Sequence, residues 1–401
     1  MRGGKRRVLV AYGTRPEAIK LAPVVREISR SPWLEPVVAV SGQHREMLDQ
    51  VNELFGITPD IDLDIIAPGQ TLTQVTNRAL DGYSNYVAAG EFDAAIVQGD
   101  TTTAFAAALA AFYAQTHVVH VEAGLRTGHM YSPFPEEINR RLISQMATLH
   151  LAPTGMSRDN LLAEGVDAGD ITVTGNTVID ALTHAAGLRR PIGNVEVDGA
   201  ISAGRPILLV TAHRRESWDT GLAAIGNAVA AVARAHPEVL VAVPVHANPI
   251  VRERLLPPME GIPNVEVLEP LSYGPFSHLL SRSAVVLTDS GGIQEEAPTF
   301  GVPVLVTRNT TERPEAVQAG TARLVGTQSG GIFSAVSRAL SRPAAGARSA
   351  DGAAAMAPAN PFGDGKAAVR TRAAVEALFG VGQRRPEFTL PEPVLAEAYA
   401  S

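Results

Sequence analysis

The sequence predicts an α/β protein with two domains, each built around a parallel β-sheet. Apolar bursts rich in Val, Leu and Ile alternate with longer amphipathic stretches along the whole chain, a pattern typical of βαβ units. A second series of such units begins after about residue 185. With 401 residues and 45% hydrophobic content, the chain is long enough to fill two cores.

The predicted elements follow one another in order in each half. The first half is expected to form strands within RVLVAYG (7–13), EPVVAVSG (35–42), DAAIVQGD (93–100) and HVVHVEAG (117–124), with helices between them. The second half is expected to form strands within PILLVTAH (206–213), VLVAVPVH (239–246), NVEVLEP (264–270), AVVLTDSG (284–291), VPVLVTR (302–308) and TARLVG (321–326). A continuous apolar strand without polar alternation indicates a sheet that is covered on both faces.

The domain boundaries are predicted from composition. Residues 190–206 are rich in Gly and Pro and show no clear period, so the linkage is expected near them, between domains 1–185 and 186–364. Residues 341–365 indicate an irregular connection, a helix is expected within 365–380, and 381–401 reads as a loosely held tail. Two such sheets facing each other predict a ligand site in the crevice at the carboxyl ends of their strands.

Composition narrows the class of partner. Acidic residues exceed basic ones, 41 to 34, so the net charge of −7 argues against a binder of nucleic acid or of anionic membranes. The absence of cysteine excludes disulfides, thiolate nucleophiles and Cys-ligated metals. The apolar run VLVAY is too short for a signal-peptide core, so we expect a soluble, cytoplasmic protein.

Polar clusters follow the predicted strands in both halves. They are GTRPEAIK (13–20), QGDTTT (98–103), HVEAGLRTG (120–128) with PFPEEINRR (133–141), TAHRRES (211–217), PVHANP (244–249), TDSGGIQEEA (288–297) and RNTTERPEAV (308–317). Each also has a purely structural explanation, such as a helix cap supplied by Asp100 or solvated pairs of Glu136 with Arg140 and Glu137 with Arg141. Capping does not need Arg, His and Glu together, so we favour one shared site between the domains.

The segment TDSGGIQEEA predicts a phosphate-binding helix start. Ser290, Gly291 and Gly292 offer a hydroxyl and closely approachable backbone N–H groups to a diphosphate, although a Gly pair is also common at a tight packing contact. Glu296 is the expected acceptor for two ribose hydroxyls, and Glu295 is expected to face solvent. A nucleotide diphosphate attached to a sugar meets both demands.

Other ligand classes fit the sequence less well. His213 and His246 lack the spacing of a zinc site, and the phosphate-loop and GxGxxG motifs are absent, which weakens the NTPase and dehydrogenase interpretations. Basic side chains are expected to neutralise the phosphates without a metal: Arg15, Lys20, His213, Arg214, Arg215 and Arg313.

Taken together, the motifs resemble a known family. GTRPEAIKLAPV, QGDTTT, HVEAGLRTG, PEEINRR, TGNTVID (174–180), AHRRES, DSGGIQEEAPTFGVPVL and TTERPEAV occur in the order and spacing of the non-hydrolysing UDP-N-acetylglucosamine 2-epimerases, over about residues 7 to 380. The resemblance implies two Rossmann-like domains in a GT-B arrangement with an inter-domain cleft, a homodimer, and a C-terminal helix that crosses back onto the first domain. It also implies reversible conversion of UDP-GlcNAc to UDP-ManNAc without NAD or metal.

The same resemblance assigns roles to individual residues. Asp100, Glu122 and Glu136 match the catalytic carboxylates, with Arg140 beside the last and His213 on the opposite wall of the cleft. Positions matching the UDP-sugar site are Arg15, Lys20, His213, Arg214, Ser290, Gly291, Gly292, Glu296 and Arg313. Which carboxylate acts on which face of C2 is left open.

The sequence departs from the family pattern at the site where many bacterial members bind a second, activating UDP-GlcNAc. Gln43 is present, but Glu46 stands where a second glutamine is common and Gly69 where an arginine is common. Losing a cation and gaining an acid weakens the binding of a diphosphate, so we expect little or no activation.

Three rival functions share the nucleotide site. A GT-B glycosyltransferase needs an acceptor groove and one base, whereas three acids follow the first-half strands here. A hydrolysing epimerase releases free ManNAc, and an inactive nucleotide-sugar sensor does not need Asp100, Glu122 and Glu136, all of which are present. The sequence leaves open whether the sugar is GlcNAc or a modified relative, and which pathway uses it.

Overall fold

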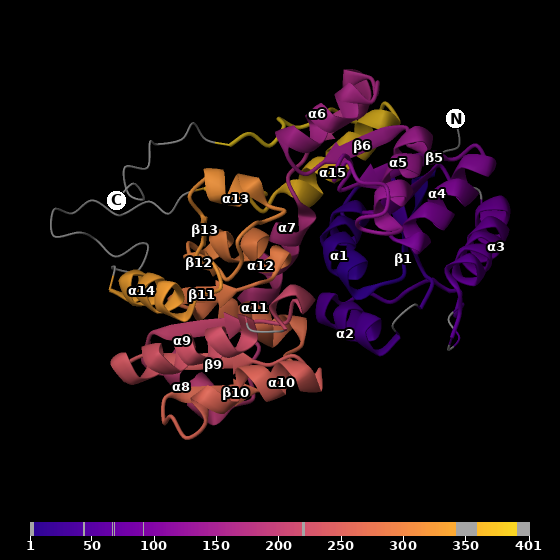
Figure 1. Ribbon diagram of the computed structural model, residues 1–401. Coiled ribbons are helices and arrows are strands. Elements are labelled where there is room, and N and C mark those ends of the chain that lie inside the picture. The colour runs from indigo at the N-terminus through magenta and orange to yellow at the C-terminus, as the bar shows by residue number, and fades with distance from the viewer. Residues whose placement is uncertain are drawn as a thin grey trace. The chain divides into compact units, whose positions relative to one another are not determined.

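The structure is a computed structural model, and it describes residues 4–42, 45–65, 67, 69–90, 92–218, 221–341 and 359–390. For residues 45, 46 and 217 only the backbone is described. The chain divides into two compact units, Met1–Ala181 with Phe362–Thr389, and Leu182–Pro361 with Leu390–Ser401 (Figure 1). The first division falls within helix α7, ahead of residues 190–206.

The first unit contains a seven-stranded, all-parallel sheet in the order β3-β2-β1-β4-β5-β6-β7. Its strands are β1 (Arg6–Tyr12), β2 (Leu34–Val40), β3 (Ile61–Asp62), β4 (Ala94–Gln98), β5 (His117–Val121), β6 (Leu149–Ala152) and β7 (Ile171–Val173). Its helices are α1 (Arg15–Ser29), α2 (Arg45–Phe55), α3 (Leu72–Gly90), α4 (Thr102–Tyr113), α5 (Glu136–Met146), α6 (Gly155–Ala163), the start of α7 (Thr177–Gly187), and α15 (Ala367–Leu378).

Helices cover both faces of this sheet. Apolar side chains of α3 and α4 pack with Leu9 and Ala11 of β1 in one core, while α1 and α2 lie on the other face and α15 packs on α1 (Figure 1). Val8 to Tyr12 are fully buried, which explains why β1 lacks polar alternation. The helix expected within 365–380 is α15, and its Glu376 accepts a hydrogen bond from Ser31 at 2.7 Å.

The second unit contains a six-stranded parallel sheet in the order β10-β9-β8-β11-β12-β13. Its strands are β8 (Ile207–Thr211), β9 (Leu240–Pro244), β10 (Val265–Leu268), β11 (Val285–Thr288), β12 (Val304–Val306) and β13 (Ala322–Leu324). Its helices are α8 (Val195–Ala203), α9 (Gly221–Ala235), α10 (Pro249–Leu255), α11 (Tyr273–Arg282), α12 (Gly291–Glu296), α13 (Pro314–Gln318) and α14 (Ser329–Leu340). Short 3-10 helices complete the two units: η1 (Ala168–Asp170), η2 (Arg215–Ser217), η3 (Pro257–Met259) and η4 (Ala297–Phe300).

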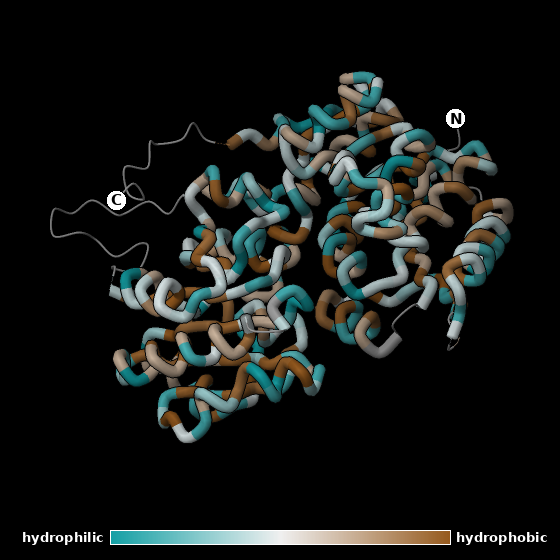
Figure 2. Tube along the Cα trace, in the orientation of Figure 1, coloured by the Kyte–Doolittle hydropathy of each residue, from teal (hydrophilic) through white to brown (hydrophobic). Residues whose placement is uncertain are grey.

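Both sheets have the doubly wound order of Rossmann-like folds, so the predicted fold class is confirmed. In each sheet the strand order reverses beside the central strand, between β1 and β4 and between β8 and β11, where ligands of such folds bind. Hydrophobic segments, brown in Figure 2, run through the interior of each unit. No helix among the described residues is both long and apolar enough to cross a membrane.

Four elements of the described structure were not predicted from the sequence. Residues 190–206 contain a regular helix, α8, which Asn194 caps by accepting a hydrogen bond from Val197 N at 3.0 Å. Strands β3, β6 and β7 were also not expected.

The C-terminal segment is also held more firmly than expected. Phe388 is buried, and its N–H donates to Val173 O at 2.8 Å, while Glu387 pairs with Arg158 at 3.0 Å. The expected tail therefore begins with a segment that is bound to the edge of the first sheet. Residues 391–401 of that tail, and 342–358 of the expected irregular connection, lie outside the described residues.

Candidate functional site

All seven predicted polar clusters lie at the carboxyl ends of strands, as expected. In the first unit, β4 and β5 pair in parallel up to Gln98 and Val121, so Asp100 and Glu122 leave the sheet from neighbouring strands. Glu122 has a left-handed backbone with φ of 63°, which turns the chain sharply at the end of β5. The two carboxyls are close enough that the charge of Glu122 contributes to raising the pKa of Asp100.

Glu122 is held by donors from three different elements. Lys20 Nζ on α1 lies 2.6 and 2.7 Å from its two carboxylate oxygens. Gln98 Nε2 at the end of β4 donates to Oε2, and Asn176 Nδ2 donates to Oε1 at 3.1 Å. The structure thus gives Lys20, which was expected at the phosphates, a carboxylate partner within its own unit.

Asp100 is paired with the guanidinium of Arg140. Arg140 Nε lies 3.0 Å from Asp100 Oδ2, and Nη2 donates to the same oxygen. Burial raises the pKa of Asp100 above its usual value, although the Arg140 charge and hydrogen bond oppose that rise. A carboxyl with a raised pKa is a better proton acceptor than an ordinary aspartate.

The two glutamates at the start of α5 differ in their surroundings. Glu137 is fully buried and pairs with Arg140 at 3.3 Å and with Arg141 at 3.1 Å. The expected pair of Glu137 with Arg141 is therefore present, but Glu137 is buried and not solvated. Arg140 pairs with Asp100 and Glu137. Glu136 is half-buried, and its Oε2 is buried without a hydrogen-bond partner among the described residues.

Glu17 is a buried acid that sequence reasoning did not single out. It accepts hydrogen bonds from Gly13 N at 3.1 Å and Thr14 N at 2.8 Å, and from Thr101 Oγ1 at 2.6 Å. Thr101 in turn caps α4 by accepting from Ala104 N at 3.0 Å, so the cap is Thr101 and not Asp100. Burial raises the pKa of Glu17. A Glu three residues after a Thr N-cap was the available signal.

In the second unit, Asp289 organises the turn after β8. It is fully buried, and its Oδ2 accepts from the backbone N–H groups of His213 and Arg214, both at 2.9 Å. His213 Nδ1 lies 3.5 Å from Asp289 Oδ1, and its ring stacks on His246 at 5.7 Å. Burial lowers the pKa of His213 despite the Asp289 charge, and the His246 and Arg214 charges lower it further.

The helix start at Ser290 could accommodate a side chain at either Gly. Ser290 is the N-cap of α12, but its side chain makes no capping hydrogen bond. A Cβ on Gly291 would approach nothing closer than Arg214 Nη2 at 3.5 Å, and one on Gly292 nothing closer than Ser290 Oγ at 4.0 Å. Neither Gly has a left-handed backbone. Packing within the protein therefore does not require the Gly pair, and the tight-packing explanation is wrong.

The expectation that Glu295 faces solvent is also wrong. Glu295 is 6% exposed and pairs with Arg313, whose Nε donates to its Oε1. Its neighbour Glu296 is half-buried, one position further along α12. Arg313, expected at the phosphates, is thus held in the second unit by a buried carboxylate.

Three expected cations remain, and Arg215 lies over the ring of Trp218, 5.8 Å from its centroid. Arg214 Nη2 lies 3.8 Å from Glu312, an exposed side chain. Arg15 at the start of α1 is exposed and has no ion-pair partner among the residues that the structure describes. The guanidinium groups of Arg214 and Arg15 are therefore accessible to an anionic ligand.

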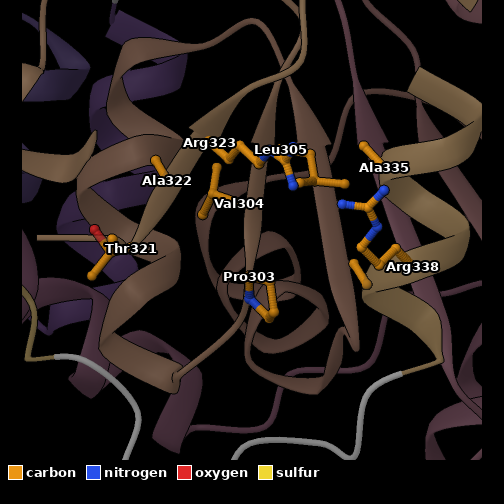
Figure 3. Close-up of a pocket in the computed structure, with 10 residues that line it drawn as sticks. Pro303, Val304, Leu305, Thr321, Ala322, Arg323, Ala335 and Arg338 are labelled. Atoms are coloured by element: carbon orange, nitrogen blue, oxygen red, sulfur yellow. The ribbon is translucent and has the colours of Figure 1, made fainter. Parts of the chain in front are cut away.

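A small pocket of the second unit lies away from these residues. It is lined by Pro303 to Leu305, Gly320 to Arg323 and one face of α14, as Figure 3 shows. Pro303 and Thr321 precede β12 and β13, so the pocket is at the amino ends of the strands, opposite the edge that bears Ser290. We do not assign it to the site.

Two expectations concern a site without a metal ion and a weakened site for a second UDP-GlcNAc. In the described ranges, no three His, Asp or Glu side chains gather where they could hold a metal ion. Gln43 lies outside the described residues, as does the side chain of Glu46. Gly69 is described, and it has a left-handed φ of 74°.

Comparisons with known proteins agree with the motifs. The model of the family described as UDP-N-acetylglucosamine 2-epimerase matches residues 26–376. A probable UDP-N-acetylglucosamine 2-epimerase of Ralstonia solanacearum is 48% identical over 386 residues, covering 93% of this chain and 100% of the relative. The UDP-N-acetylglucosamine 2-epimerase of Escherichia coli (strain K12) is 47% identical over 372 residues, covering 91% and 96%.

A solved structure of a member of the same family is also similar to this chain. The crystal structure of UDP-GlcNAc 2-epimerase from Neisseria meningitidis, bound to UDP-GlcNAc, has a TM-score of 0.77 and 42% identity, and the match covers 93% of this chain and 99% of that one. These matches confirm the resemblance of the motifs. The chain belongs to the UDP-N-acetylglucosamine 2-epimerase family.

Proposed function

We propose that this protein interconverts UDP-GlcNAc and UDP-ManNAc by inverting C2 of the sugar. Its family membership and the UDP-GlcNAc bound in the Neisseria meningitidis relative support the substrate class. The observation that supports the chemistry best is the pair of acids at neighbouring strand ends, Asp100 and Glu122, each held by a different cation. Inversion needs a proton removed from one face of C2 and another delivered to the opposite face, and therefore at least two such groups.

The proposed reaction proceeds by elimination and re-addition. The C2 hydrogen of an N-acetylhexosamine has no adjacent carbonyl on the ring to make it acidic. When UDP leaves C1, positive charge builds there and the C2 hydrogen becomes acidic enough for a carboxylate to remove. The products are 2-acetamidoglucal and UDP, and protonation of the other face of C2 with return of UDP to C1 completes the inversion. The net reaction involves no change of redox state.

The surroundings of the three acids support different parts in these steps. Asp100, with a raised pKa, is suited to accept and return a proton. Glu122 is held by Lys20, Gln98 and Asn176, which fix its carboxylate in one orientation. Glu136 has one buried oxygen without a partner among the described residues, and a substrate hydroxyl or amide would satisfy it.

The second unit is proposed to bind the UDP part. A Cβ on Gly291 or Gly292 would meet no atom outside its own helix closer than 3.5 Å, so we expect the diphosphate to approach the backbone N–H groups there, with the Ser290 hydroxyl beside them. Arg214, Arg313 and His213 are proposed to stabilise the diphosphate as it leaves C1. Glu296 remains the proposed partner of the ribose hydroxyls.

The reaction is tested in heavy water. Purified protein is incubated with UDP-GlcNAc in D₂O, and the C2 position of both nucleotide sugars is read by NMR and mass spectrometry. We expect deuterium at C2 of recovered UDP-ManNAc and no accumulation of free ManNAc. In Asp100→Asn we expect neither epimerisation nor incorporation of deuterium at C2. Unlabelled product would exclude proton exchange with these acids, and release of free ManNAc with UDP would indicate a hydrolysing enzyme.

The identity of the sugar needs a separate comparison. A panel of UDP-sugars, including UDP-GlcNAc and 2,3-diacetamido derivatives, is followed by its anomeric NMR signals. We expect UDP-GlcNAc to be converted fastest, and faster conversion of a modified sugar would reassign the substrate.

A further inference from the structure

The centre of the motif TGNTVID, Asn176, lies next to Glu122. Residues 174–180 connect the end of β7 to the first turn of α7, where the chain leaves the first unit. Asn176 is only 4% exposed, so its polar groups need partners inside the protein. Its hydrogen-bond partners Glu122, Val178 and Phe362 all lie within the first unit.

Asn176 makes hydrogen bonds through three different atoms. Its Nδ2 donates to Glu122 Oε1 at 3.1 Å, and its Oδ1 accepts from Val178 N at 3.0 Å, at the start of α7. Its backbone N–H donates to Phe362 O at 2.7 Å. Phe362 is the residue at which the chain re-enters the first unit. One residue thus joins a proposed catalytic carboxylate to the two passages of the chain, the segment that leaves the first unit at α7 and the segment that returns at Phe362.

The two passages are in close backbone contact. A Cβ on Gly175, which has a φ of 85°, would lie 3.3 Å from Gly363 Cα. A Cβ on Gly363 would lie 3.2 Å from Ile179 Cγ1 and 3.4 Å from Asn176 N. Asp180 completes the contact by accepting from Ala367 N and Ala368 N at 3.1 and 2.9 Å. Any shift of residues 362–363 must therefore move the backbone of Asn176.

We propose that Asn176 is a positioning residue that orients the carboxylate of Glu122 and couples that orientation to the returning segment at Phe362 and Gly363. This inference rests on the proposed function of Glu122. Lys20 provides charge to both oxygens of Glu122, whereas the planar amide of Asn176 defines the direction of one of them. A carboxylate that acts on one face of C2 needs such fixed direction.

The first test removes only the amide donor. Asn176→Ser keeps an oxygen able to accept from Val178 N but loses the group that donates to Glu122. Asn194→Ser is the matched control, because Asn194 also caps a helix and its Nδ2 donates to a glutamate, Glu266, at 3.1 Å. Both variants lose one N–H donor to a carboxylate.

For Asn176→Ser we expect kcat to fall roughly ten- to hundredfold, the size expected for a lost hydrogen bond to a charged group, with KM and the Kd for UDP within about threefold of wild type. Asn194→Ser is expected to keep kcat within about twofold, since its glutamate lies outside the proposed site. Equal losses of kcat in the two variants, or a raised KM with unchanged kcat in Asn176→Ser, would overturn the proposal.

The second test changes the returning segment, at Gly363, where it contacts the backbone of Asn176. Gly363→Ala places a methyl group against Ile179 and the Asn176 backbone, so we expect kcat to fall several-fold or more while UDP binding persists. Gly155→Ala, with nothing within 4 Å of the added carbon, is the control in the same unit and should match wild type. If Gly363→Ala keeps the kcat of wild type, the proposed coupling between Glu122 and the returning segment is wrong.

Crystal structures of the variants separate this inference from the proposed function. We expect the Glu122 carboxylate to turn in Asn176→Ser and to keep its wild-type orientation in Asn194→Ser. If wild type shows no exchange at C2 but Glu122 turns, the proposed function fails and the positioning role stands. If wild type is active and Glu122 keeps its orientation in Asn176→Ser, the positioning role fails alone.

Discussion

Lys20 Nζ lies 2.6 Å from one carboxylate oxygen of Glu122 and 2.7 Å from the other, although 101 residues separate the two in the chain. The Lys20 side chain is 20% exposed and that of Glu122 8% exposed, so the pair is largely shielded from water. In this setting the lysine neutralises an acid of the proposed site.

Lys20→Met is expected to lower kcat about a hundredfold or more while leaving the Kd for UDP within about threefold, because Glu122 loses its counter-charge. An unpaired buried carboxylate should also cost about 3 kcal/mol of folding stability. Steady-state kinetics, calorimetric titration with UDP and urea unfolding measure the three effects. Lys5→Met, whose lysine donates to Ser31 O, is the control. A large loss of UDP affinity with normal kcat would indicate that Lys20 binds the phosphates of UDP, as the sequence analysis expected.

Asp289→Asn is expected to weaken UDP binding and to cost about 1–3 kcal/mol of stability, because the turn at His213 and Arg214 loses its charged acceptor. The matched control is Asp198→Asn, since Asp198 also accepts from two consecutive backbone N–H groups, Ile192 at 2.9 Å and Gly193 at 3.0 Å. Calorimetry and chemical unfolding of both variants give the comparison. If Asp198→Asn weakens UDP binding equally, the effect of Asp289 is not specific to the site.

Gly291→Ala and Gly292→Ala are expected to separate stability from binding. The protein has room for either Cβ, and Ala is favoured over Gly in helices by about 1 kcal/mol, so the melting temperature should stay the same or rise. The added methyl group would obstruct a diphosphate, and we expect the Kd for UDP to increase at least about tenfold. Wild-type affinity in both variants would place the diphosphate elsewhere.

The stability of the first unit should depend on pH through Asp180. Burial raises the pKa of Asp180 to about 6, with the Asp364 charge adding to the rise and the hydrogen bonds from Ala367 and Ala368 opposing it. The folded state therefore holds this proton at pH values where the unfolded chain, with a pKa of 3.8, has released it. This contribution to stability is present below pH 4 and is lost as pH rises through 6.

Asp180→Asn lacks that ionisation. From pH 4 to pH 7, the stability of wild type relative to Asp180→Asn should fall by up to about 3 kcal/mol, from about two pKa units at 1.36 kcal/mol each. Urea unfolding of both proteins at several pH values measures the difference. A difference that is constant with pH, or that grows toward pH 7, would contradict this account.

Activation by a second UDP-GlcNAc is expected to be weak or absent, because Glu46 and Gly69 replace the residues common at that site. The reverse reaction from pure UDP-ManNAc should therefore start without a lag, and traces of UDP-GlcNAc should leave its initial rate unchanged. The rate is followed by NMR with and without added UDP-GlcNAc. A reaction that begins only after the addition would show that the activating site is retained.

The sequence determined the class of fold and the edge of each sheet that bears the site. Strands such as Val8 to Tyr12 are apolar throughout because helices cover both faces, and that requirement is visible in a single stretch of residues. The polar residues that follow each strand were visible in the same way. Strands β3 and β7 gave no such signal.

The partners of the polar groups were decided only by the tertiary structure. Glu295 was expected in solvent and instead pairs with Arg313, while Lys20 pairs with Glu122 and Asn176 joins Glu122 to Phe362. The spacing of residues in a helix or strand specifies which side chains share a face, but an ion pair between distant segments depends on how those segments pack. The sequence thus determined which residue types gather at the strand ends, and the packing of the helices determined which of them bind one another.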